Sequence, residues 1–304
     1  MNIKDIRKIL IIGAGTMGHQ IGFLCATHGC DVAVYDIDPE ILKKAEERTK
    51  ALSERFISKG RLSPEAAAQT LARISFTDDP EAAGRNADLV SESVPEDPAL
   101  KGRIFAQFNG ICPERTIFTT NTSSLVPSMF ADATGRPERF LAFHFHDVAL
   151  NNVVDVMPHP GTSPEAAETV RAFAEKIGQL PIVLKKEQPG YVFNTMLMTL
   201  LDAALNLATK EVASVEDIDR AWMGIMHTAS GPFGIMDSVG LDTVWKITAY
   251  WAEKRNDPRA KKNAEFIKTY LDKGRLGKKS GQGFYAYPDP AFAAREFLAG
   301  KGSA

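Results

Sequence analysis

Hydrophobic and polar residues alternate along the first half of the chain in a way that predicts parallel strands joined by helices. An apolar, β-branched run at 9–12 ends at glycine, which is typical of a buried strand. Residues 16–29 carry apolar side chains at helical spacing, and 31–35 return to a strand pattern. This gives a strand–helix–strand unit of about 30 residues. Similar short apolar runs predict further strands at 87–91, 116–120, 140–143, 153–157 and 181–184.

The pattern changes at Pro189-Gly190, a pair that favours a turn or a boundary. From 191 to 271 the apolar positions follow helical spacing, and none of this stretch reads as a strand. The sequence therefore predicts an α/β domain over 1–187, with a mostly parallel, doubly wound sheet. A smaller all-helical domain is expected to follow over 188–304.

Length and composition agree with a globular protein of two domains. The chain has 304 residues, whereas a typical single domain has about 100–150. A formal net charge of −2 does not favour nucleic acid or an anionic membrane surface as a partner. Cys25, Cys30 and Cys112 have no metal-binding spacing, and the first residues lack the apolar segment of a signal peptide. These features favour a cytoplasmic protein.

A glycine-rich loop follows the first predicted strand. The run Gly13-Ala14-Gly15-Thr16-Met17-Gly18 fits the G-x-G-x-x-G pattern of Rossmann-type dinucleotide-binding domains. Gly13 would allow the tight turn, Gly15 the approach of a pyrophosphate, and Gly18 close packing of helix on strand. Asp36 ends the second strand, where a carboxylate binds the adenosine ribose and repels a 2′-phosphate. NAD is therefore the expected cofactor; a purely structural turn is the weaker interpretation, because strand, helix and acid are all present.

Ser123, His144 and Asp155 supply a hydroxyl, an imidazole and a carboxylate just after the predicted nucleotide-binding segments. Oxidation of an alcohol needs a base with a pKa near working pH, and histidine is the natural choice. His146 is a rival base, because residues 144 and 146 share a face if the chain is extended there. A metal site of two histidines and a carboxylate is a weaker hypothesis, since a nicotinamide enzyme needs no metal here. No metal is expected.

Several motifs, in order along nearly the whole chain, resemble the L-3-hydroxyacyl-CoA dehydrogenase family, including bacterial 3-hydroxybutyryl-CoA dehydrogenases. They are Asn121-Thr122-Ser123-Ser124-Leu125, the runs 135–140 and 144–145, Pro189-Gly190-Tyr191-Val192-Phe193-Asn194, and the runs 231–233, 237–242 and 279–285. The resemblance implies a Rossmann-type domain followed by a helical domain that dimerises.

The resemblance also implies roles for individual residues. His144 would be the base, or the acid in the reducing direction, with Asp155 in place of the family's glutamate to orient it. Ser123 would hydrogen-bond the reacting oxygen and Asn194 would hold substrate. Lys59 would meet CoA phosphates, although a solvated lysine is an equal alternative. The cofactor would be bound by the glycine loop, including Thr16 and Met17, and also by Glu96, Lys101 and Asn121.

The chain departs from the family after the histidine. The family run His-Phe-Phe-Asn-Pro is replaced by His-Phe-His-Asp-Val at 144–148, and the loop to Asp155 is one residue shorter. The expected activity is NAD-dependent interconversion of a short-chain L-3-hydroxyacyl-CoA, 3-hydroxybutyryl-CoA above all, and its 3-keto form. One alternative is a dehydrogenase of a free 3-hydroxy acid, similar to L-gulonate 3-dehydrogenase. A non-catalytic NAD-binding structural protein is the other.

Overall fold

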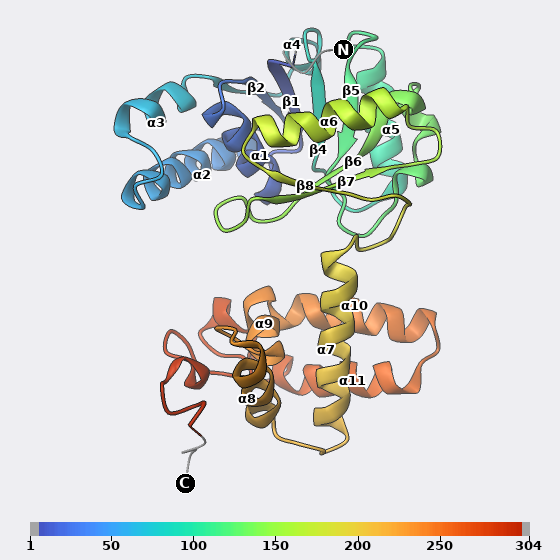
Figure 1. Ribbon diagram of the computed structural model, residues 1–304. Helices are drawn as coiled ribbons and strands as arrows, with labels where there is room; N and C mark the ends of the chain where they lie inside the picture. Colours follow the sequence, from blue (N-terminus) through green and yellow to red (C-terminus); the bar gives the residue numbers. More distant parts are fainter. Residues whose placement is uncertain (1–5, 300–304) are drawn as a thin grey trace. The chain divides into compact units, whose positions relative to one another are not determined.

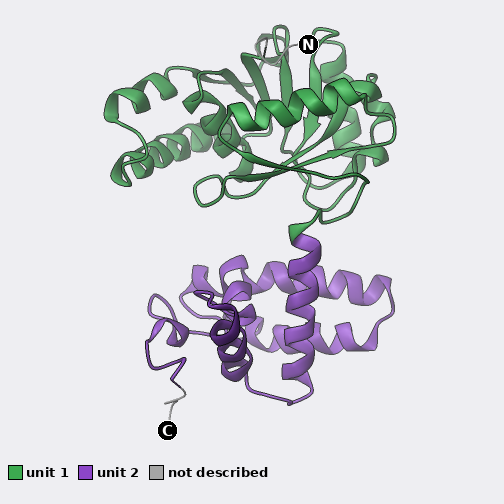
Figure 2. Ribbon diagram, in the orientation of Figure 1, with its two compact units in different colours: residues 1–193 green, residues 194–304 purple. Residues whose placement is uncertain are grey.

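The computed structural model describes residues 6–299 and divides into two compact units, 1–193 and 194–304 (Figures 1 and 2). Unit 1 is built on a single eight-stranded sheet in the order β3-β2-β1-β4-β5-β6-β7-β8. The strands are β1 (Lys8–Ile12), β2 (Asp31–Tyr35), β3 (Ile74–Thr77), β4 (Leu89–Glu92), β5 (Ile117–Thr120), β6 (Phe140–Phe145), β7 (Val153–Pro158) and β8 (Leu180–Val183). All neighbours are parallel except β6 and β7.

Six α-helices belong to the described part of unit 1. They are α1 (Thr16–Thr27), α2 (Pro39–Ser58), α3 (Pro64–Leu71), α4 (Pro80–Gly84), α5 (Pro98–Asn109) and α6 (Pro164–Lys176). Alternate residues of β1 point to opposite faces, as strand geometry requires. Ile9 and Ile11 join a core cluster with residues of α1, α2 and α6, whereas Leu10 and Ile12 join one with α4 and α5. Both faces are covered, so the predicted doubly wound α/β architecture is confirmed.

One strand is absent from the sequence prediction. In β3, Ser75 is exposed while Ile74, Phe76 and Thr77 are only half-buried. This strand lies at the edge of the sheet and pairs only with β2 within the described residues. A half-buried edge strand lacks the continuous apolar run that marked the central strands.

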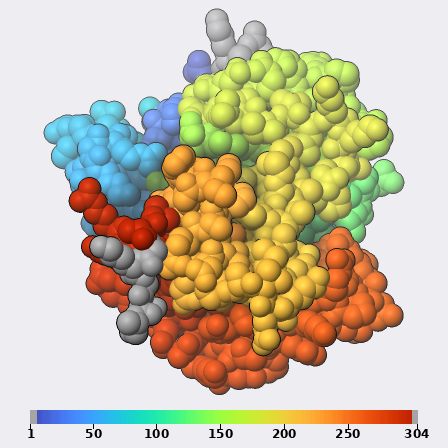
Figure 3. All heavy atoms as spheres, turned by 60° about the horizontal axis from the view of Figure 1, so that its bottom comes forward, coloured from blue at the N-terminus to red at the C-terminus, as the bar shows by residue number. Residues whose placement is uncertain are grey.

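Unit 2 is helical, as predicted, and the atoms of its described residues are yellow to red in Figure 3. Its helices are α7 (Phe193–Thr209), α8 (Val215–Met226), α9 (Pro232–Val239), α10 (Leu241–Lys254) and α11 (Pro258–Leu271). Leu201, Leu205, Phe233 and Leu241 belong to its core cluster. None of the helices in residues 6–299 combines the length and apolar character needed to cross a membrane.

Candidate active site

The antiparallel pairing of β6 and β7 places a histidine directly opposite a carboxylate. His144 and Asp155 are register partners in this pair, so their side chains lie on the same face of the sheet. His144 Nδ1 lies 3.0 Å from Asp155 Oδ2, and both residues are buried. Because an ionised carboxylate only accepts hydrogen bonds, the proton between these two atoms belongs to Nδ1, and in the neutral imidazole the lone pair is then on Nε2.

Ser123 lies on the other side of the imidazole, in the loop that follows β5. Its Oγ is 3.1 Å from His144 Nε2, so hydroxyl, imidazole and carboxylate form one continuous hydrogen-bonded line. Burial alone would raise the pKa of Asp155, but hydrogen bonds from His144 and His146 outweigh it and hold the pKa below its usual value. Asp155 therefore remains ionised at neutral pH and can orient the imidazole.

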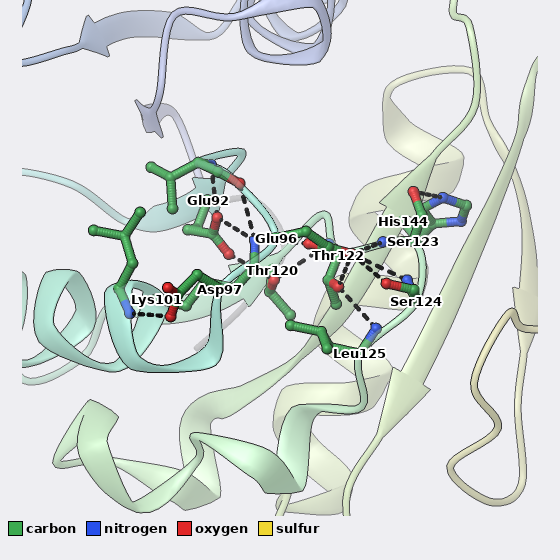
Figure 4. Close-up of polar contacts among 12 residues, drawn as sticks. Glu92, Glu96, Asp97, Lys101, Thr120, Thr122, Ser123, Ser124, Leu125 and His144 are labelled. Atoms are coloured by element: carbon green, nitrogen blue, oxygen red, sulfur yellow. Dashed lines mark hydrogen bonds and ion pairs between the residues drawn. The ribbon is translucent and has the colours of Figure 1, made fainter. Parts of the chain in front are cut away.

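The loop that carries Ser123 is fixed by Glu96 (Figure 4). One carboxylate oxygen, Oε1, accepts from Thr122 Oγ1 at 2.5 Å, from Ser123 N at 2.9 Å and from Ser124 N at 3.1 Å. Burial raises the pKa of Glu96, but hydrogen bonds from the loop and the charge of Lys101 reverse the effect and lower it. An ionised Glu96 thus holds the backbone and hydroxyl groups that define the position of Ser123.

Lys101 links Glu96 to a second carboxylate that the sequence analysis did not single out. Its Nζ lies 3.2 Å from Glu96 Oε2 and 2.7 Å from Glu92 Oε1. Lys101 and Glu92 are buried, and Glu92 also accepts from Thr120 Oγ1 at 2.6 Å and from Val94 N at 2.7 Å. Burial raises the pKa of Glu92, and Lys101 offsets part of that effect. A charged residue at the end of a fully buried strand was the feature that could have identified Glu92.

His146 lies on the same face as His144, as strand alternation predicts. Its Nε2 is 3.4 Å from the same oxygen, Asp155 Oδ2, that accepts from His144. The donor atoms of the two histidines and Asp155 lie within 4.8 Å of one another. The hydrogen bond from His144 and the 3.4 Å contact of His146 bring these three groups together at one carboxylate oxygen.

The glycine-rich loop has the geometry of a phosphate cradle. Gly13 has φ +96°, and a Cβ there would lie 2.8 Å from Ser93 O. A Cβ on Gly18 would lie 1.9 Å from Gly13 O, so only glycine lets α1 approach the loop so closely. A Cβ on Gly15, by contrast, would meet nothing within 4 Å, which leaves open space beside the backbone at the start of α1. That space suits a pyrophosphate at a helix N-terminus.

Asp36 lies beside this loop and accepts from Ala14 N at 2.9 Å. Thr16 and Met17 form the first turn of α1; Thr16 is exposed and Met17 is half-buried against the core. A carboxylate next to a glycine loop with open backbone space fits the ribose and pyrophosphate of NAD.

The remaining predicted residues lie in different surroundings. Asn121 is buried: its Oδ1 accepts from Phe145 N at 2.7 Å, and its N–H donates to Glu92 O at 2.8 Å. Lys59 is exposed at the C-terminal end of α2. Asn194 is the second residue of α7 and the first of unit 2, whereas Ser123 and His144 belong to unit 1.

A doubly wound sheet, a dinucleotide loop and a hydroxyl–imidazole–carboxylate line together define the chain as a nicotinamide-dependent oxidoreductase. The chain belongs to the 3-hydroxyacyl-CoA dehydrogenase family. The family's NAD binding domain matches residues 8–188, and its C-terminal domain matches residues 190–287. The predicted family and the predicted cofactor, NAD, are thereby confirmed.

Individual relatives agree over nearly full length. A probable 3-hydroxybutyryl-CoA dehydrogenase of Bacillus subtilis is 34% identical over 94% of this chain and 99% of its own. The crystal structure of (S)-3-hydroxybutyryl-CoA dehydrogenase from Ralstonia eutropha has a TM-score of 0.83 at 31% identity, covering 93% of this chain and 100% of that one. A diketoreductase, described in connection with catalysis of dicarbonyl compounds, has a TM-score of 0.87 at 39% identity, covering 93% and 99%.

Proposed function

We propose that this chain interconverts short-chain L-3-hydroxyacyl-CoA thioesters, 3-hydroxybutyryl-CoA above all, and the corresponding 3-ketoacyl-CoA. The observation that carries the proposal is the hydrogen-bonded line from Ser123 through His144 to Asp155. The 3-hydroxybutyryl-CoA dehydrogenases among the relatives support the acyl class.

In the oxidising direction, His144 is the proton acceptor for the 3-hydroxyl group. The Nδ1 proton is held by Asp155, so Nε2 is the nitrogen with a free lone pair, and it faces Ser123 Oγ. Ser123 hydrogen-bonds the reacting oxygen and keeps it near Nε2. A bound NAD would supply the acceptor for the hydride that leaves the carbon bearing this oxygen. Oxidation leaves His144 as an imidazolium, which Asp155 stabilises. In the reducing direction His144 returns this proton to the same oxygen.

The other predicted residues complete the proposed site. Glu96 and Lys101 support the nicotinamide half by fixing the Ser123 loop, which is consistent with their hydrogen bonds. Asn194 is proposed to hold the substrate, and Lys59 to meet the phosphates of CoA. Asp36 and the glycine loop are proposed to bind the adenosine half of NAD.

The direct test is the reduction of acetoacetyl-CoA with NADH, followed as the loss of NADH absorbance. We expect saturable turnover that is lower by orders of magnitude with NADPH, because Asp36 repels a 2′-phosphate. Free acetoacetate, which lacks the CoA portion, is the matched control. Absence of NADH oxidation above background with acetoacetyl-CoA would remove the proposal.

A second candidate is the reduction of dicarbonyl compounds that carry no CoA. The 39% identity to the diketoreductase over almost the full length of both chains favours it. The free 3-hydroxy acid dehydrogenase is a related alternative. Comparison of kcat/KM for acetoacetyl-CoA, acetoacetate and a small diketone such as pentane-2,4-dione distinguishes the three. A higher kcat/KM for either molecule without CoA would replace the thioester activity with that candidate.

We also propose that two copies associate through the helical domain, 188–304, and that the enzyme acts in the cytoplasm. The association of two copies is supported by exposed apolar side chains on unit 2. These are Met196, Ile225, Met226 and Tyr250. The cytoplasmic location is supported by three buried cysteines without a disulfide. Light scattering would test the association, with a mass of one chain as the contradicting result.

A further inference from the structure

We propose that His146 is a positioning residue, which donates its Nε2 proton to Asp155 and thereby holds that carboxylate in the orientation that aligns His144. The inference rests on the proposed role of His144 as proton acceptor. It assigns His146 a task different from that of a second base.

The backbone explains why a second imidazole reaches this carboxylate. β6 ends at Phe145, and His146 follows two residues after His144, on the same side of the extended chain. Asp155 lies opposite His144 in the antiparallel register. Both histidines therefore reach the same carboxylate. The side chain of His146 is 18% exposed, whereas that of His144 is 4% exposed.

Both imidazoles converge on one oxygen atom. His144 Nδ1 is 3.0 Å and His146 Nε2 is 3.4 Å from Asp155 Oδ2. A carboxylate with a single partner could rotate about its terminal torsion, which is broad for aspartate. A second donor at the same oxygen restricts that rotation, so Oδ2 stays directed at His144 Nδ1. The two donors also oppose the effect of burial on the pKa of Asp155, which lies below its usual value.

The ring of His146 is itself held in place. It meets the His144 ring edge-on, with centroids 4.8 Å apart and planes at 74°, and it meets Phe193 at 5.7 Å and 88°. The nitrogen that contacts Asp155 is Nε2, whereas Ser123 Oγ contacts Nε2 of His144. In this geometry Nε2 of His144 is the nitrogen available to the reacting oxygen, whereas Nε2 of His146 contacts the carboxylate of Asp155.

Two variants separate the hydrogen bond from the packing. His146→Gln keeps an N–H donor at a similar distance from the backbone and loses the ring. His146→Phe keeps an aromatic ring against Phe193 and loses the donor. His227→Asn is the control, because His227 is an exposed residue in the left-handed conformation at the end of α8, which asparagine tolerates.

Two measurements are made on each variant after its melting temperature shows that it is folded. The first is kcat for acetoacetyl-CoA with NADH. The second is the ¹⁵N spectrum of the histidine rings without substrate, with His144 assigned from a His144→Gln sample. We expect His146→Phe to lower kcat about tenfold with little change in KM, because one charge-assisted hydrogen bond is lost. His146→Gln should stay within about threefold of the parent.

The spectrum reports the positioning itself. His144 should show a protonated Nδ1 in the parent and in His146→Gln, and a mixture of both tautomers in His146→Phe. Unchanged kcat and tautomer in His146→Phe, or equal losses in both variants, would overturn the inference. So would a loss in His146→Phe as complete as in His144→Gln with the His144 tautomer unchanged, since His146 would then be the base. If the parent turns over no substrate, the proposed function fails, while the tautomer comparison still decides the role of His146.

Discussion

The phenol ring of Tyr191 lies flat against the imidazole of His144, with ring centroids 4.4 Å apart and planes at 6°. The hydroxyl of Tyr191 donates to Thr122 O at 2.6 Å, so one side chain contacts both the imidazole and the loop that carries Ser123. Tyr191 is 1% exposed, and burial raises its pKa, which keeps the hydroxyl protonated as a donor. Tyr191 therefore couples the position of the proposed base to that of the serine.

Replacing Tyr191 should separate these two contacts. Tyr191→Phe keeps the stacked ring and leaves Thr122 O without this donor, so we expect a stability loss of about 1 kcal/mol and a fall in kcat of a few-fold. Tyr191→Leu loses the stacked ring as well and should cost about 2–4 kcal/mol, with a larger fall in kcat. Urea unfolding and steady-state kinetics of the two variants check the order. A Leu variant as active as the Phe variant would show that the stacked ring does not orient His144.

His144→Gln should lose most of the activity without losing cofactor. General base catalysis contributes about 10²–10⁴-fold, so kcat should fall by that range. His144 lies on β6, whereas the glycine loop precedes α1, so NADH affinity should stay within about twofold. Fluorescence titration measures the affinity for NADH, and single-turnover kinetics measure the rate of the chemical step. Full activity in this variant would transfer the base role to His146.

The sequence predicted the sheet well where a strand has a full apolar pattern, and failed where it does not. The runs at 9–12 and 31–35 lie in β1 and β2, each of which pairs with a neighbour on both sides in the mostly parallel sheet. Their burial on both faces requires continuous apolar residues, and this is visible in the sequence. Within the described residues β3 pairs with a single neighbour, β2. Its sequence therefore mixes apolar and polar residues, and local propensity could not distinguish it from a loop.

The site could be predicted only in part, because strand pairing and packing in the folded protein bring its residues together. The residue types of Ser123, His144 and Asp155 indicate their chemistry, but the antiparallel pairing that sets His144 against Asp155 appears only in the folded sheet. The contacts that Glu92 and Tyr191 make in the site could not be predicted for the same reason. Their partners, Lys101 and His144, are distant along the chain or lie on another element, and no local pattern encodes such contacts.

Gly15 offers a test of cofactor binding that does not disturb the fold. Nothing lies within 4 Å of a Cβ at this position, so Gly15→Ala should leave the melting temperature nearly unchanged. The added methyl group would enter the space proposed for the pyrophosphate, and we expect NADH affinity to fall about tenfold or more. Calorimetric titration with NADH measures the change.

The matched control for Gly15→Ala is Gly224→Ala, in α8, where a Cβ also meets nothing within 4 Å. This change should leave NADH affinity as it is, and it should raise stability slightly because alanine is the better helix former. If both variants bound NADH like the parent, the cofactor would not approach the backbone at Gly15.

The buried pair of Glu92 and Lys101 should be costly to break from one side. Lys101→Met leaves Glu92 buried beside only neutral donors, and the loss of one partner of a buried ion pair typically costs about 3–5 kcal/mol. Combining it with Glu92→Gln removes the uncompensated charge, so the double variant should be more stable than Lys101→Met alone. A double-mutant cycle from urea unfolding gives the coupling energy. Additive effects within about 0.5 kcal/mol would mean that the two charges do not stabilise each other.

The pH dependence of stability should depend on Asp219 in unit 2. This buried carboxylate accepts from Phe233 N at 2.8 Å, from Gly234 N at 3.0 Å and from the hydroxyl of Tyr285 at 3.0 Å. Burial raises its pKa from 3.8 to about 6, and the three hydrogen bonds offset only part of that effect. The folded protein therefore holds the Asp219 proton more tightly than the unfolded chain does.

A raised pKa in the folded state means that the linked stability is fully present below about pH 4 and is lost as pH rises through about 6. A shift of about two units corresponds to about 3 kcal/mol. The charge of the neighbouring Asp237 also raises the pKa of Asp219. Asp219→Asn has no carboxyl group to titrate at this position and serves as the reference. The difference in unfolding free energy, wild type minus variant, should therefore fall by up to that amount between pH 4 and 7. Urea unfolding at a series of pH values measures it; a difference that rises with pH would mean that the three donors hold Asp219 ionised in the folded protein.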